Sequence, residues 1–120
     1  MAQTKRAFFV GMIFLGSLMC ASQAHAQMLG NDLLRKCTSG FNSVEQALCI
    51  GYLHGVVEGA MGIKAMEGRP QIFELPKGVD IIQVRDVVVK FLKKENAKDR
   101  QIGAVALIFK ALTEAYPPKS

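Results

Sequence analysis

Residues 43–70 read SVEQALCIGYLHGVVEGAMGIKAMEGRP, and this stretch decides the fold. Ser43 and Gln46 form a capping box, in which the serine hydroxyl accepts the Gln46 amide while the glutamine side chain reaches back. The apolar pattern that follows continues until a glycine and a proline end it. The stretch therefore predicts a long helix from Val44 to about Met66.

A row of glycines is the unusual feature of this helix. They recur at i, i+4, i+8 and i+11, so they share one helix face: Gly51, Gly55, Gly59 and Gly62. Each costs roughly 0.8–1 kcal/mol of helix stability relative to alanine, so some contact should benefit from the missing side chains. We expect a close-packed face on which another helix of the same chain lies. The alternative is a groove or a dimer seam, where the backbone of a partner comes close.

The first 26 residues have the three parts of a secretory signal peptide. Lys5-Arg6 is a basic start, residues 7–20 are almost entirely apolar, and Ala24-His25-Ala26 is a cleavage pattern. The apolar run is shorter than the roughly 20 residues that a membrane-spanning helix needs, which disfavours an uncleaved anchor. We therefore expect cleavage after Ala26 and a mature periplasmic protein without a membrane segment.

The remaining domain, residues 27–120, is small. It has room for a single hydrophobic core, and large enzyme folds such as a TIM barrel do not fit. The whole sequence has a net charge of +5, and loss of Lys5 and Arg6 leaves 13 basic and 10 acidic residues. A net charge of +3 on an exported protein does not point to nucleic acid as a partner.

Two cysteines, Cys37 and Cys49, remain once Cys20 is removed with the leader. Their spacing is too wide for a CxxC redox motif, and two thiols alone make a poor zinc site. An even pair in an oxidising compartment is typical of a structural disulfide. Closing a loop of this size contributes about 3 kcal/mol in the chain-entropy model, a large share for a small domain.

Three further helices are expected. Residues 31–36 form a short helix with Asn31 as its N-cap, and residues 81–94 carry polar side chains at helical rather than alternating spacing. The last helix spans residues 97–115, with one core stripe: Ile102, Val105, Phe109, Leu112 and Tyr116. Residues 67–79 hold two prolines and two glycines and form the longest loop. The fold class is all-α, a compact bundle of about four helices with one disulfide.

The sequence offers no constellation for catalysis and no cofactor or metal motif. His54 is the sole candidate base after position 26, and Glu58 one turn later is more typical of local helix support than of catalysis. A basic cluster around the start of the last helix is interleaved with acids and is interpreted as a solvated turn: Lys90, Lys93, Lys94, Lys98 and Arg100.

Several short segments, in this order and spacing, are similar to those of a known family. They are Gly30-Asn31-x-Leu33-Leu34-x-x-Cys37, Cys49-x-Gly51-Tyr52-Leu53-x-Gly55, Phe73-x-x-Pro76-x-Gly78-Val79, Val87-Val88-Val89-Lys90-Phe91-Leu92 and Ala111-Leu112-x-x-Ala115-Tyr116-Pro117. The chain resembles the periplasmic immunity proteins of the Rap/Tai type, which protect bacteria from amidase effectors of type VI secretion. The resemblance covers nearly all of the chain after the leader.

The resemblance implies an all-helical, non-catalytic domain, often a homodimer, that binds a peptidoglycan amidase and blocks its active site. A protruding loop would suit an inhibitory surface, and we expect residues 67–79 to supply it through Arg69, Glu74 and Lys77. Family members often carry a second cysteine pair, but Glu74 and Pro118 stand in those places here. We expect the loop and the C-terminal tail to be less tightly joined as a result.

Two other functions stay open at this point. A small periplasmic stress or chaperone-like protein would use exposed apolar surface along the glycines and have no cognate effector. A degenerate enzyme or small-ligand carrier would have a deep apolar pocket between the long helix and the last one, lined by Gly55, Gly59 and Phe109.

Overall fold

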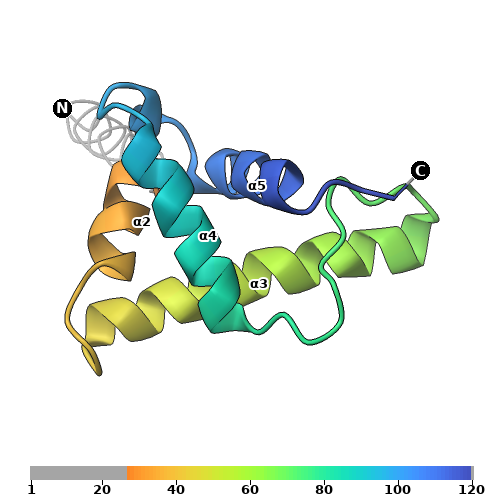
Figure 1. Cartoon of the computed structure of the whole chain (residues 1–120), viewed down its shortest axis with the longest axis horizontal. Helices are drawn as coiled ribbons and strands as arrows, with labels where there is room; N and C mark the ends of the chain where they lie inside the picture. Colours follow the sequence, from red (N-terminus) through yellow and green to blue (C-terminus); the bar gives the residue numbers. More distant parts are fainter. Residues whose placement is uncertain (1–26, 120) are drawn as a thin grey trace, which may run out of the picture.

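The computed structural model describes residues 27–119. The expected signal peptide, residues 1–26, lies outside the described residues. Within them the regular secondary structure is all helical apart from one isolated bridge between Leu29 and Gly103. The helices are α2 (Gly30–Cys37), α3 (Val44–Glu67), α4 (Ile81–Lys94), the short 3-10 helix η1 (Asp99–Gln101) and α5 (Ala104–Ala115), as Figure 1 shows. The expected all-α fold with four helices is confirmed.

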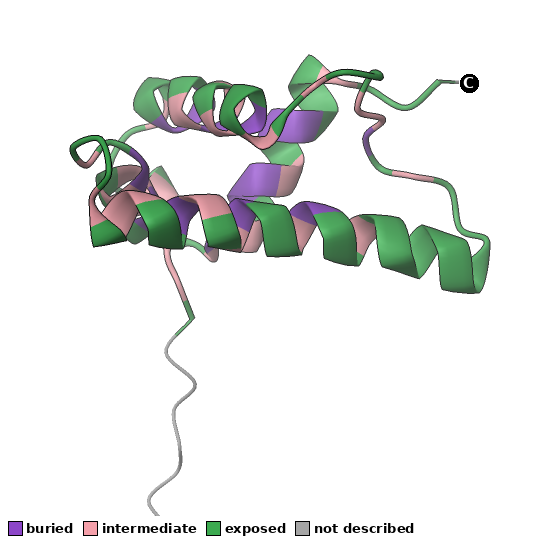
Figure 2. Ribbon diagram, turned by 90° about the horizontal axis from the view of Figure 1, so that it is seen from below, coloured by how far each residue is buried: buried purple, intermediate pink, exposed green. Residues whose placement is uncertain are grey.

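The four α-helices enclose one core at the N-terminal half of α3. Helix α4 packs against α2, α3 and α5, and α2 also packs on α3. The second half of α3 extends beyond this core and is largely exposed in Figure 2. The core is apolar throughout and includes the disulfide: Leu33, Cys37, Cys49, Leu53, Val57, Phe73, Val84, Val88, Phe91, Leu92, Ala104, Leu107, Ile108, Ala111 and Leu112.

The ends of α3 lie close to where the sequence places them. The Ser43 hydroxyl accepts the Gln46 amide at 3.1 Å, so the N-cap is confirmed. The return bond differs, because the Gln46 side chain accepts from the amide of Asn42 rather than from that of the cap residue. At the other end Gly68 has φ 64°, a left-handed conformation that favours glycine, and its N–H donates to the Lys64 carbonyl at 2.9 Å.

The start of α2 corrects one expectation. Asn31 is not the N-cap, because the helix begins at Gly30 after Leu29, which provides no side-chain cap. Its side chain instead links two distant segments, donating to the Ala97 carbonyl at 2.9 Å and accepting from Arg100 at 2.8 Å. Gly30 allows this close approach, since a Cβ there would lie 2.8 Å from the Arg100 carbonyl oxygen.

The start of α5 also differs from the expectation, by seven residues. Residues 102–103 are not helical, because they lie beside the chain that enters α2: Gly30 donates to the Ile102 carbonyl at 3.1 Å and Ala104 to the Met28 carbonyl at 2.8 Å. Asn96 does not cap α5; its side chain accepts from the Asp99 amide at 2.9 Å, at the first residue of η1, whose N-cap is Lys98. The expected core stripe is confirmed in part, because Leu112 is buried and Phe109 and Tyr116 pack against the core. Ile102 is 46% exposed, and the buried residues are Ala104, Leu107, Ile108, Ala111 and Leu112.

The disulfide between Cys37 and Cys49 is present and joins the end of α2 to the second turn of α3. Both cysteines are buried, and their Cα atoms are 5.1 Å apart. The bond therefore fixes α2 at the same end of α3 that the apolar core covers. None of the helices within residues 27–119 is both long enough and apolar enough to cross a membrane.

Candidate partner-binding surface

The loop of residues 68–80 leaves the projecting end of α3 and returns along the molecule to α4 (Figure 1). Its middle is anchored by Phe73, which is 3% exposed and whose ring centroid lies 6.1 Å from that of Phe109. A second anchor is polar, because the Thr113 hydroxyl donates to the Ile72 carbonyl at 3.1 Å. The loop is thus a long connection held against α5, with its polar side chains on the outside.

The three charged residues expected on this loop are separated along it. Arg69 is exposed and its Nε lies 2.7 Å from the carboxylate of Glu67 at the end of α3. Glu74 is half-buried and Lys77 is exposed. No hydrogen bond or ion pair joins these three side chains to one another within residues 27–119. They offer a strip of alternating charge rather than one cluster.

Polar contacts join the loop to the C-terminal tail, residues 116–119. The Glu74 amide donates to the Tyr116 carbonyl at 3.0 Å, and the Glu74 carboxylate lies 3.6 Å from Lys119 Nζ. The Lys119 amide also donates to Glu74, at 3.4 Å. Polar contacts therefore join the loop and the tail at Glu74, one of the two places where members of the resembled family often carry a second cysteine pair.

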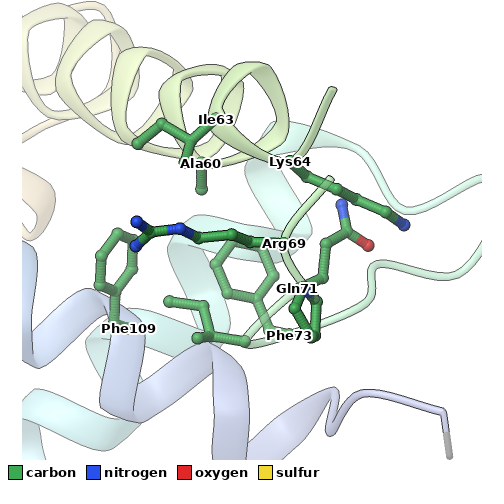
Figure 3. A pocket seen from close by; sticks show the side chains of 9 residues that line it. Ala60, Ile63, Lys64, Arg69, Gln71, Phe73 and Phe109 are labelled. Carbon is green, nitrogen blue, oxygen red and sulfur yellow. The ribbon is translucent and has the colours of Figure 1, made fainter. Parts of the chain in front are cut away.

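A cavity of about 210 Å³ lies between the projecting end of α3, the loop and α5 (Figure 3). Most of its lining is apolar, with cationic side chains at Lys64 and Arg69 and the amide of Gln71. The apolar part is Ala60, Ile63, Pro70, Ile72, Phe73 and Phe109. A pocket near Phe109 was expected of a ligand carrier, but neither Gly55 nor Gly59 lines this one.

The glycine stripe of α3 is open, which corrects the expectation of close packing within the chain. All four glycines are exposed, and a Cβ added at any of them would have no neighbour within 4 Å: Gly51, Gly55, Gly59 and Gly62. The helices of this chain pack on the opposite side of α3, where Cys49, Leu53 and Val57 are buried. Close approach by a partner backbone stays a prediction.

The stripe is longer than its glycines. Continuing the spacing of three and four residues in both directions leads to Val44, Leu48 and Met66, all of them exposed, and Met66 at 88%. We call these three residues and the four glycines the stripe face. Alternating steps of three and four place apolar residues along one seam of a helix, as in coiled coils. This signal lies in the sequence and could have been found there.

The polar groups near α3 have structural roles. Lys36 donates to the Glu45 carboxylate at 2.6 Å, and this hydrogen bond lowers the pKa of Glu45 from 4.5, helped by the charges of Lys36 and Arg35. Burial raises the pKa of Tyr52 from 10.0. His54 is exposed and lies 3.7 Å from Glu58, an arrangement typical of a helix surface.

The basic residues near α5 that the sequence groups together make separate contacts in the structure. Arg100 points inward and donates to the Leu92 carbonyl at 2.9 Å and to that of Glu95, so it ties η1 to the end of α4. Lys94 pairs with Glu114 at 2.9 Å. Within residues 27–119 no three His, Cys, Asp or Glu residues gather as a metal site.

Comparison with models of known protein families gives a match over most of the chain. A family model described as Rap1a immunity proteins matches residues 29–118, which span all the helices described above. The chain belongs to the Rap1a family of immunity proteins. The resemblance to Rap/Tai-type proteins is thereby confirmed, and a Rap1a protein is expected to act by binding an effector protein. No curated protein and no solved structure gives a significant match.

Proposed function

We propose that this Rap1a protein is a periplasmic, non-catalytic inhibitor of a peptidoglycan amidase delivered by type VI secretion. Membership of an immunity family over residues 29–118 is the observation that carries the proposal. The leader-like sequence of residues 1–26 and the buried disulfide suit an exported protein. Inhibition needs only that the effector's active site be covered, so no catalytic group on this chain is required.

The effector-binding surface in this proposal is the loop of residues 68–80, with Arg69, Glu74 and Lys77 as its charged contacts. The loop is exposed along most of its length yet anchored by Phe73 and by the contacts of Glu74 with the tail. A surface that is already ordered loses less conformational entropy on binding. Charged side chains along its outside would set the register and the rate of association.

We further propose that the protein is a homodimer through the stripe face of α3. The face is apolar, unpartnered within the described chain, and nearly self-complementary, because Gly55 is at its middle with four-residue and three-residue steps on both sides. An antiparallel crossing at Gly55 would set Leu48 of one protomer near Gly62 of its partner. Small residues at the crossing allow two helix backbones to come close.

The proposed function is tested by affinity capture from periplasmic and secreted fractions with the tagged protein, followed by mass spectrometry. One peptidoglycan hydrolase in a 1:1 ratio, inhibited on binding, is the expected result. The double variant Arg69→Glu/Lys77→Glu should bind it more weakly, while Lys93→Glu/Lys98→Glu on exposed residues elsewhere should not. A spread of unrelated clients, unaffected by either variant, would instead favour a stress-related or chaperone-like protein.

The dimer is tested separately by sedimentation. Wild-type protein should sediment as a dimer, and Gly55→Leu should be a folded monomer, because the added side chain has open space in the monomer but none at a close helix crossing. Val89→Leu, on the half-buried side of α4, is a control that leaves the stripe face unchanged. A monomeric wild-type protein would contradict the dimer without affecting the proposed inhibitory role.

A further inference from the structure

The cavity beside the loop combines an apolar floor with a cationic edge. Two aromatic rings, Phe73 and Phe109, form the base, and Ile63 of α3 covers one side. Lys64 lines the side of the cavity at the end of α3, and Figure 3 shows the Arg69 side chain extended across the cavity, with its guanidinium beside Phe109. The lining therefore offers dispersion contacts from the two rings and Ile63, together with the positive charges of two side chains.

The volume of the cavity limits the size of the group that it can hold. Small-molecule sites commonly measure about 300–1,000 Å³, and this one is about 210 Å³. An engineered apolar cavity of about 150 Å³ holds one benzene molecule, so the space suits a single ring or a large aliphatic side chain. Interfaces between proteins commonly place such a side chain in a pocket of this kind, where it supplies much of the affinity.

The positive charges of the cavity lining determine which chemical group of the partner is favoured beside the bound side chain. Lys64 has no ion pair within residues 27–119, while Arg69 shares its charge with Glu67. Two cations against one carboxylate leave a net positive edge, which favours a partner with an acidic group close to its apolar side chain. A partner with a basic group at that position would be disfavoured by the same charges.

We propose that this cavity is the anchor site for the partner protein, and that it takes an aromatic or large aliphatic side chain flanked by a carboxylate. The inference rests on the proposed function, because it assigns the effector as that partner. It goes beyond the charged loop residues by making Lys64 and the cavity floor the determinants of specificity. Arg69 belongs both to the charged strip of the loop and to the cavity lining, so the strip adjoins an apolar centre, and a polar rim beside an apolar centre is usual in specific interfaces.

The site is first tested without any effector, by titrating isotope-labelled protein with 3-phenylpropionate, which joins one ring to one carboxylate. Saturable NMR shifts are expected at the amides of Ala60, Gln71 and Phe73. The neutral analogue 3-phenyl-1-propanol should bind about two- to fivefold more weakly at low salt, as expected for one exposed ion pair. Shifts that do not saturate, or equal affinity for the two probes, would overturn the inference.

Two variants locate the binding. Ala60→Trp places an indole at the cavity wall and should abolish the shifts, while Ala106→Trp, on the exposed side of α5, should keep them. Lys64→Glu changes an exposed residue and should remove the preference for the carboxylate, whereas Lys93→Glu should not. Retained probe binding in Ala60→Trp with a native spectrum would overturn the assignment.

Measurements of inhibition of the effector then test this inference separately from the proposed function. A hydrolase that wild-type protein inhibits should be inhibited at least tenfold less well by Ala60→Trp and unchanged by Ala106→Trp. Equal inhibition by both variants would overturn the anchor site and leave the proposed function standing. A wild-type protein that binds no hydrolase would overturn the proposed function, and with it the partner assigned here.

Discussion

The two halves of α3 have similar composition, but the first packs against the core and the second is exposed. The first half supplies Cys49, Leu53 and Val57 to the core and is tied to α2 by the disulfide. The second half, residues 58–67, has no buried residue, and only Ala60 is half-buried. Glycines and apolar side chains occur in both halves, so composition alone does not separate them. Neighbouring helices cover one side of the first half and bury no residue of the second.

Because of this difference, we expect the buried side of the first half to determine stability and the second half to determine binding. Substitutions of the buried residues in the first half, Cys49, Leu53 and Val57, should lower the free energy of unfolding, because they alter packed contacts. Substitutions in the second half should leave it nearly unchanged and alter binding, because their side chains lie at the surface or at the anchor cavity. The variants below test this division, beginning with the largest effect.

Leu53→Ala should lower the free energy of unfolding by about 2–5 kcal/mol, because Leu53 is 0% exposed and its loss leaves a cavity. The matched variant in the second half is Ile63→Ala, at a residue that is 55% exposed. Its effect should stay within about 0.5 kcal/mol. Urea unfolding followed by circular dichroism measures both. Similar losses from the two variants would show that the second half is also part of the folding core.

Loss of the disulfide should cost about 3 kcal/mol, as expected for a closed loop of this length. The double variant Cys37→Ala/Cys49→Ala removes the bond without leaving a reactive thiol. Thermal unfolding with and without a reductant should shift for the wild-type protein and not for the variant. Since the bond lies at the far end of α3 from the loop, probe binding at the anchor cavity should persist while the variant stays folded.

Sequence patterns predicted the elements that local signals define. Ser43 with Gln46 places the start of α3, and that cap is present. The helical spacing of polar side chains over residues 81–94 predicted α4, which has these bounds. Local signals could not place the start of α5, because contacts between residues 102–104 and residues 28–30 keep that segment extended. Such pairing joins segments over 70 residues apart. The α5 core stripe was right only in part, because a helix that is apolar on several sides does not specify which side the other helices cover.

The candidate site was predictable in part. The loop position follows from its prolines and glycines, and the charges on it are evident in the sequence. The cavity is not, because Ala60, Phe73 and Phe109 come from three segments that only the fold brings together. The side of α3 that faces the core was also ambiguous, since a helix that is apolar on several sides does not specify which side is covered.

Replacement of glycine by alanine should change the stability in opposite directions at Gly55, which is open, and at Gly30, which is closely packed. Gly55→Ala should raise the stability of the monomer by roughly 0.8–1 kcal/mol, because the added methyl group meets no neighbour. Gly30→Ala should lower it, since the methyl group would lie 2.8 Å from the Arg100 carbonyl oxygen. Melting temperatures measured at a dilution where the wild-type protein is monomeric report both. A destabilised Gly55→Ala monomer would mean that the stripe face is packed within the chain.

The smallest expected effect concerns the ion pair at the first turn of α3. The hydrogen bond from Lys36 lowers the pKa of Glu45 from 4.5 in the folded protein, so the carboxylate contributes stability above about that pH and loses it as pH falls through the folded-state pKa. Glu45→Gln should therefore lower the melting temperature slightly at pH 7. The difference should vanish in acid, once the carboxyl is protonated in both states.

Glu67→Gln, at the exposed end of α3, removes a pair between two exposed side chains and should change the melting temperature less. An effect of Glu45→Gln that grew as pH fell would contradict the stabilising role of the pair and place its origin in packing instead.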